Sequence, residues 1–310
     1  MAKRFWRKLA ILAKVETTYG TDAVPTGAAN AMQMTEVSLT PLAGEEVSRD
    51  LMLAHFGHQG VMLVGDYVEL QGSVEIAGSG TAGTAPAYGP LLRACGMSEV
   101  LAVGVSATYQ PVSAGQEGVS IYANLDGVNH KLLGARGTLT FGFTPKQIPR
   151  FTFTLRGLLG AIADTALPTA VLTGFKAPVP VSKTNTPVLT LHGYSAIGES
   201  LSIDVANSVE SRNLIGEDSI QITNRQSTGS LVVEAGSIAA KDWFAIARAH
   251  TKDALALQHG TVAGNIVDVL ASKVQIGRPT YGQTQGITNL TLPLMLTPNL
   301  GDDELSIVVR

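Results

Sequence analysis

Hydrophobic and polar residues alternate strictly in two stretches of the chain. In residues 148–155 (IPRFTFTL) apolar side chains occupy every second position, and residues 287–294 (ITNLTLPL) repeat this pattern in the same phase. A period of two places alternate side chains on opposite faces of an extended chain. Each stretch is therefore predicted to be a β-strand with one face in a core and one face exposed.

These two strands are the last members of a series of four segments that occurs twice in the same order. In each series the predicted order is a strand, a second strand, a short amphipathic helix and the alternating strand. Gly89 and Pro90 weaken the first of the two helices. The paired segments are 47–51 and 208–214, 72–78 and 229–236, 87–95 and 241–249, and 148–155 and 287–294.

The repeated series predicts a duplicated unit and a mainly β fold. The fold expected is two tandem β-sandwich or barrel domains, each with one short flanking α-helix, preceded by an extended N-terminal arm. The first copy carries an extra segment around residues 97–120. The predicted parts are an arm at 1–35, a first domain at 36–160, a proline-containing connector at 161–195 and a second domain at 196–310.

Composition fits sheets joined by tight turns and a surface covered by other copies of the chain. Charged residues make up only 15% of the 310 residues, hydrophobic residues 45%, and there are 33 glycines. A protein of this size that stays alone in solution normally carries more surface charge. The net charge of −3 argues against a basic nucleic-acid-binding surface. Cys95 is the single cysteine, so no intramolecular disulfide is possible.

A cluster of basic and aromatic residues opens the chain. Outside this cluster the sequence contains 18 basic and 25 acidic residues. Such a cluster could bind a phosphate backbone or stack on bases, or it could anchor an arm on an acidic neighbouring subunit with Trp6 as a buried hot spot. The acidic remainder favours the subunit contact. Its residues are Lys3, Arg4, Phe5, Trp6, Arg7 and Lys8.

The segment that follows this cluster is not expected to act as a signal peptide. The apolar run 9–13 is shorter than a signal peptide requires. No stretch of the sequence reaches the length of a membrane span. A protein folded in a cytoplasm is expected.

No motif in the sequence supports catalysis. Residues 78–83 (GSGTAG) match the spacing of a dinucleotide-binding loop, but that loop requires alternating strands and long helices, so a glycine-rich surface loop is favoured. His55 and His58 lie in a glycine-containing segment, and their spacing alone is weak support for a metal site. A non-enzymatic protein without a catalytic site, a metal or a cofactor is predicted.

Three segments resemble a known family. Residues 13–26 (AKVETTYGTDAVPT) are similar to the opening of major tail tube proteins of long-tailed, non-contractile bacteriophages. Residues 63–76 (LVGDYVELQGSVEI) and 85–96 (APAYGPLLRACG) are similar to the same family. The resemblance covers the first half of the chain directly, and the internal repeat extends it to the second.

The resemblance implies a structural virion protein of the phage tail. Six domains of this family would join edge to edge into a ring, and stacked rings would form a hollow tube through which DNA is ejected without specific binding. A tape measure protein and tail tip or terminator proteins are the partners implied, and no membrane is involved. If each chain carries two such domains, three chains suffice for a ring of pseudo-sixfold symmetry, whereas six chains with a decorating second domain are the rival arrangement. Another β-rich phage or adhesion protein (capsid, baseplate or carbohydrate-binding module) is the alternative function.

Overall fold

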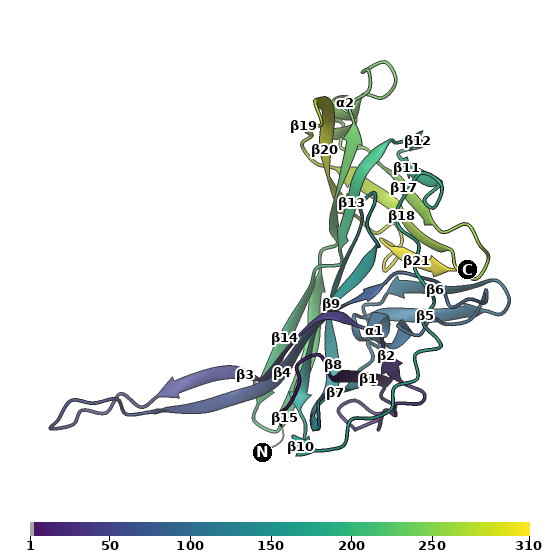
Figure 1. Ribbon diagram of the computed structural model, residues 1–310. Coiled ribbons are helices and arrows are strands. Elements are labelled where there is room, and N and C mark those ends of the chain that lie inside the picture. The colour runs from purple at the N-terminus through teal and green to yellow at the C-terminus, as the bar shows by residue number, and fades with distance from the viewer. Residues whose placement is uncertain (1–2) are drawn as a thin grey trace.

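The computed structural model describes residues 3–310, and its regular secondary structure consists almost entirely of β-strands (Figure 1). The predicted mainly β class is confirmed. The elements of the first half are β1 (Leu9–Val15), β2 (Ala31–Met32), β3 (Thr35–Ser48), β4 (Val61–Glu75), α1 (Gly89–Ala94), β5 (Met97–Ala102), β6 (Ser106–Pro111), β7 (Val119–Leu125), β8 (Val128–Phe143), β9 (Arg150–Leu159) and β10 (Ala163–Asp164). Those of the second half are β11 (Val188–Leu191), β12 (Tyr194–Ser195), β13 (Gly198–Asp204), β14 (Asn207–Leu214), β15 (Glu217–Arg225), β16 (Thr228–Glu234), α2 (Trp243–Arg248), β17 (Lys252–His259), β18 (Val267–Ile276), β19 (Thr280–Thr284), β20 (Ile287–Leu296) and β21 (Ser306–Val309).

Tight turns connect many neighbouring strands. The β7–β8 turn contains Asp126 and Gly127, and the β19–β20 turn contains Gln285 and Gly286, each with positive φ. Two successive residues with positive φ are what a two-residue hairpin turn requires, because its twist then matches that of the strands. The turns thus keep sequence neighbours antiparallel and fix their register.

Both halves of the chain contain the same order of hydrogen-bonded strands. In the first half the order is β1-β7-β8-β9-β4-β3. In the second half it is β11-β17-β18-β20-β16-β13. Every one of these pairs is antiparallel, and the hairpin β5–β6 is an addition to the first half. A helix follows β4 in one half and β16 in the other.

Each helix begins as its sequence suggests. Asp242 caps α2, and its side chain accepts a hydrogen bond from the backbone N–H of Ala245 at 2.8 Å. In α1 Pro90 occupies the first turn, where a missing N–H costs nothing. Both helices lie within the ranges expected for them, although each is only one and a half turns long.

The two halves are joined into one continuous sheet. Strand β13 of the second half adds antiparallel to the end of β8, and β21 adds to β6. One apolar core extends through both halves. The β14–β15 hairpin continues from β13 and packs on the first half, where the Arg136 guanidinium donates to the carbonyl oxygen of Ile220 at 2.9 Å and stacks on Tyr19.

The predicted N-terminal arm at 1–35 is wrong for the part that forms β1. Residues 10–13 are buried, and β1 pairs with β7 along its whole length. The predicted connector at 161–195 likewise contains β11, which pairs with β17 in the second half. Both strands were missed because they are short and mostly apolar, so they lack the period of two that marked the other strands.

Acidification below neutral pH is expected to destabilise the protein through His259. This side chain is buried beside Phe143, and burial lowers its pKa although the carbonyl of Val179 works in the opposite direction. The unfolded chain therefore takes up a proton below about pH 6.5 that the folded protein resists. The free energy of unfolding falls as the pH drops from about 6.5 to the lower pKa of the folded state.

Urea unfolding at pH 7.5 and at pH 5.5 measures this effect. In His259→Gln the loss of stability between the two pH values is expected to be smaller than in the unchanged protein. An equal loss in both proteins would assign the pH dependence to other groups, such as His130, whose pKa burial also lowers.

Candidate functional site

A path of eight strands crosses the whole molecule. Its order is β3-β4-β9-β8-β13-β16-β20-β19, and every neighbour in it is antiparallel. Four strands come from each half, and the β8–β13 pair is the joint between them. Figure 1 shows these long strands running along the body of the protein.

The two faces of this eight-stranded sheet differ sharply. One face packs into the core through large apolar side chains such as Leu70, Phe153, Ile203, Leu231 and Leu292. The other face holds the residues that alternate with them, and the rows of this face run straight across the joint. One such row is Ser73, Thr152, Thr140, Asp204 and Thr228. We call this second surface the polar face.

The polar face is rich in serine and threonine and carries a net negative charge. Three arginines lie on it, and two of them are paired with acids: Arg150 lies 3.3 Å from Glu36, and Arg156 lies 3.0 Å from Glu69. The third, Arg136, lies opposite Arg156 in the β8–β9 ladder, is buried and donates to the carbonyl of Ile220 in β15. Among residues 3–310 no ion pair is formed by the other acids of this face. The acidic residues of the face are Glu36, Glu69, Glu75, Glu199, Asp204 and Glu234.

Both ends of the eight-stranded path are open edges. Within the described part of the chain β3 pairs only with β4, and β19 pairs only with β20. All five residues of β19 are exposed. Open edges present unpaired N–H and C=O groups, which proteins normally cover or protect with charges. Residues 280–284 contain no charge.

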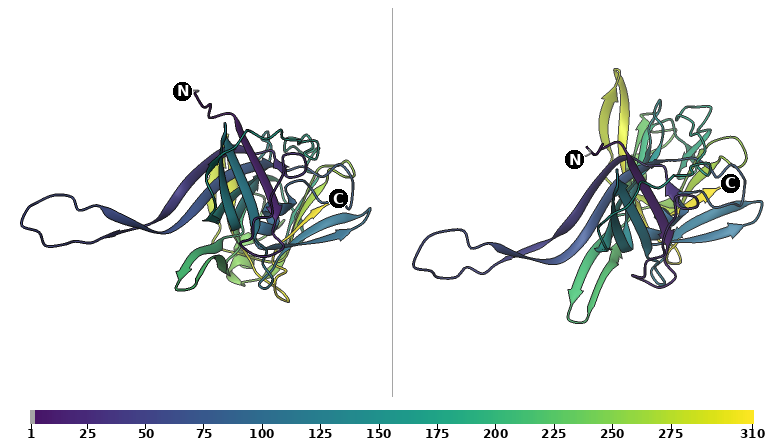
Figure 2. Two further views of the ribbon diagram at one scale, coloured as in Figure 1. Left: turned by 90° about the horizontal axis from the view of Figure 1, so that it is seen from below. Right: turned by 60° about the horizontal axis from the view of Figure 1, so that its bottom comes forward.

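The β3–β4 hairpin extends far from the body as a long arm (Figure 2). We call residues 42–64 the hairpin arm. Several of its apolar side chains are exposed, among them Val47 (48%), Val61 (45%), Met62 (55%) and Leu63 (52%). His55 and His58 lie at its tip, and in residues 3–310 no three His, Cys, Asp or Glu side chains are close enough to hold a metal ion.

The basic and aromatic N-terminal residues lie next to the β7–β8 turn of the same chain. The Phe5 N–H donates to the Asp126 carboxylate at 2.7 Å, and Arg4 contacts Asp164 at 3.3 Å. The side chains of Phe5 and Trp6 remain 57% and 64% exposed. Because both rings are mostly exposed, they are available to a partner, and the exposed Arg4–Asp164 contact itself contributes little stability.

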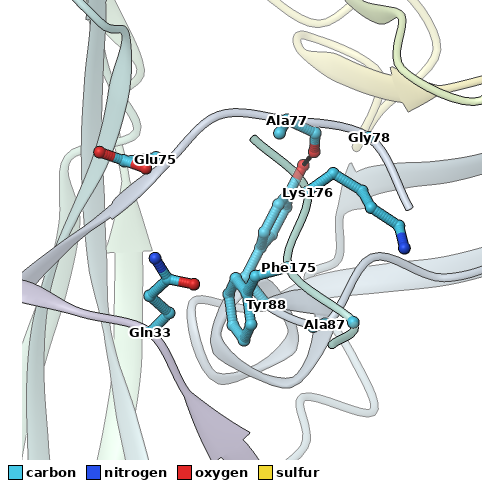
Figure 3. Close-up of a pocket in the computed structure, with 9 residues that line it drawn as sticks. Gln33, Glu75, Ala77, Gly78, Ala87, Tyr88, Phe175 and Lys176 are labelled. Carbon is cyan, nitrogen blue, oxygen red and sulfur yellow. Dashed lines mark hydrogen bonds between the residues drawn. The ribbon is translucent and has the colours of Figure 1, made fainter. Parts of the chain in front are cut away.

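The glycine-rich loop at 78–83 contacts the second half of the chain. The N–H of Gly78 donates to the side chain of Asn265 at 2.6 Å, and the N–H of Gly80 donates to the carbonyl of Gly264 at 2.8 Å. Beside this loop Tyr88 closes a small hollow and donates from its hydroxyl to the Ala77 carbonyl at 2.8 Å (Figure 3). The N–H groups that would hold a phosphate are thus used to pack the two halves together.

The nearly continuous match to one family accords with this architecture. A family described as phage tail tube protein matches residues 6–295. The chain is a structural component of the virion tail, and proteins of this class self-associate into a tube. The chain belongs to the phage tail tube family. No curated protein matches the sequence.

In the described residues, neither helix has the length and apolar character needed to cross a membrane.

Proposed function

We propose that three copies of this protein close one ring of the tail tube and that stacked rings form the channel for DNA ejection. The observation that carries this proposal is the strand order, which occurs twice in one chain and joins edge to edge at the β8–β13 pair. If family rings contain six such units, two units per chain require three chains. The units would be residues 36–160 together with β1, and residues 196–310 together with β11.

The polar face would line the channel in this arrangement. The other side of the sheet is already covered by the core. The β14–β15 hairpin covers one end of the polar face, at Arg136 and Arg156, and the rest of the face is the side left to face the lumen. Unpaired carboxylates on a Ser/Thr-rich surface would repel DNA phosphates and let the genome pass without sticking. This function needs no catalytic group, cofactor or metal. A tape measure protein, tail tip or terminator proteins and assembly in the host cytoplasm are parts of the same proposal.

Negative-stain electron microscopy with native mass measurement of isolated rings tests the proposal. Hollow tubes built from rings of three chains are the expected result. Rings of six chains would keep the tube but contradict the pseudo-sixfold assignment. Chains that remain single at high concentration and with purified tail partners would overturn the proposed function.

Residues 3–8 are proposed to contact a neighbouring subunit. Removing them, while keeping Leu9, is expected to leave thermal unfolding within a few degrees of the full chain because these residues lie outside the core. Tube formation should be poor because Phe5 and Trp6 can no longer bind a partner.

The deletion must stop before β1, since removal of its buried residues would unfold the sheet. A matched variant, Arg4→Ala, removes an exposed charge but keeps both rings and should still assemble. Tubes of normal number and length from the deletion variant would exclude this segment as a subunit contact.

A further inference from the structure

The joint between the two halves shows how one unit of the sheet attaches to the next. In the β8–β13 pair Ser202 lies opposite Gly142, Ile203 opposite Phe141 and Asp204 opposite Thr140. The side chains of Ile203 and Phe141 are buried. One unit thus offers the last part of β8, and the following unit offers β13.

Strand β19 has the same place in the second half as the last part of β8 in the first. Thr140 lies opposite Thr152 of β9, and Thr280 lies opposite Thr291 of β20. The sequences agree at these positions, with Thr-Phe-Gly at 140–142 and Thr-Tyr-Gly at 280–282.

A pair of backbone hydrogen bonds fixes the same alignment of the two halves. The N–H of Ile76 donates to the carbonyl of Pro149 at 2.9 Å, and the N–H of Ala235 donates to the carbonyl of Thr288 at 3.0 Å. These bonds lie just beyond the ends of β4 and β16. They align Pro149 with Thr288. This is the same alignment of β9 with β20 that the Thr140–Thr152 and Thr280–Thr291 pairs give.

Strand β3 has the same place in the first half as β13 in the second. Ser38 lies opposite Gln71 of β4, and Ser202 lies opposite Ser230 of β16. Both β3 and β19 are free on their outer edges in the described chain. In the first half, β3 is therefore free to pair as β13 does at the joint. In the second half, β19 is free to pair as the last part of β8 does.

We propose that β19 of one chain pairs antiparallel with β3 of the next chain, in the register of the β8–β13 joint. This inference rests on the ring assembly proposed above and names its contact. Thr40 lies opposite Thr280, Leu39 opposite Tyr281, and Ser38 opposite Gly282 of the neighbouring chain. A further pair joins Val37 to Gln283.

The chemistry of the two edges fits a second copy of the chain. Strand directions alternate along the eight-stranded path, so its last strand runs opposite to its first and the ring closes with antiparallel pairs throughout. Tyr281 is 67% exposed in the single chain, and its equivalent Phe141 is buried by the joint. Pairing with Leu39 would cover it in the same way.

Cysteine cross-linking tests the register. Thr40→Cys with Thr280→Cys places two thiols directly opposite each other, within the distance that a disulfide spans. Under mild oxidation of assembled tubes, this variant is expected to give covalent dimers and trimers on a non-reducing gel, with no larger species. Val37→Cys with Gln283→Cys provides a second directly opposed pair should the first variant fail to fold. Cys95 is buried and serves as an unreactive background thiol.

The matched control is Ser38→Cys with Thr280→Cys, which keeps both thiols on one face but displaces them by two residues. It should remain uncross-linked, because diagonal neighbours lie too far apart for a disulfide. Tubes that form normally without cross-links in either opposed pair, or with equal cross-links in the control, would overturn the register while leaving the tube function intact. Covalent species of up to six chains would support the pairing but contradict the ring of three. Failure of the unmodified protein to form tubes would overturn the proposed function itself.

Discussion

Replacing Val61 and Leu63 of the hairpin arm by serine is expected to raise strongly the protein concentration needed for tube formation and to leave the single chain folded. Both side chains are about half exposed in the single chain, so their loss costs the fold little. In a ring they would be buried on the second half of a neighbouring chain. Electron microscopy and sedimentation at a series of protein concentrations measure the effect.

The expected burial follows from the equivalent hairpin of the second half. Ser48 lies opposite Val61 in the arm, as Ser211 lies opposite Ile220 in the β14–β15 hairpin. Ile220 is fully buried on the first half of its own chain. The arm of the first half has no such surface within its own chain, and only the next chain in a ring presents one.

The size of the effect can be set from the apolar area involved. Full burial of a valine or leucine side chain stabilises by about 1.5–3 kcal/mol. Loss of two such side chains weakens each contact by roughly 3 kcal/mol, which raises the concentration needed for assembly about 100-fold.

A matched control uses the opposite face of the same arm. Val47 and Met62 face each other in the β3–β4 ladder and are exposed to a similar degree as Val61 and Leu63. Replacement of both by serine should leave assembly nearly unchanged. If the two double variants assemble equally well, the arm does not bind a neighbour in the way its counterpart binds within the chain.

Local side-chain patterns were enough to predict the strands and helices of the repeated series. The alternation in 148–155 and 287–294 predicts β9 and β20 because one face of each strand lies in the core. The family resemblance over residues 13–26, 63–76 and 85–96 is confirmed by the family match.

The register between strands could not be obtained in the same way. In the repeat read from the sequence, Gly72 corresponds to Gly229. In the structure Gly72 lies opposite Phe153, whereas Leu231 lies opposite Leu292, the equivalent of Phe153, so Gly72 corresponds to Leu231. The aligned position is therefore displaced by two residues. A displacement of two keeps the same side chains in the core, so hydrophobic pattern alone cannot distinguish the two alignments.

The contacts between the two halves could not be predicted from the sequence either. The β8–β13 joint pairs residues about sixty positions apart, and its partners Phe143 and Leu201 are ordinary members of two strand patterns. The polar face arises only after this pairing, because its rows combine residues from both halves. Residues 78–83 likewise became a contact between the halves only when residues 264 and 265 were brought beside them.

Replacing Phe151 by alanine is expected to lower the free energy of unfolding by about 3–5 kcal/mol, the usual cost of removing a buried aromatic ring. Phe151 is fully buried, and its ring centroid lies 5.3 Å from that of Phe141 and 5.4 Å from that of Tyr88. Phe141 is a partner in the β8–β13 joint, so the cavity would open directly beneath it. Urea unfolding followed by circular dichroism measures the loss, with Phe5→Ala as control because that ring is 57% exposed and should change stability by less than about 0.5 kcal/mol. Equal unfolding midpoints for the two variants would contradict a core shared by both halves at this point. Since Phe151 acts on the fold and Val61 with Leu63 on the contact between chains, the two sets of variants separate stability from assembly.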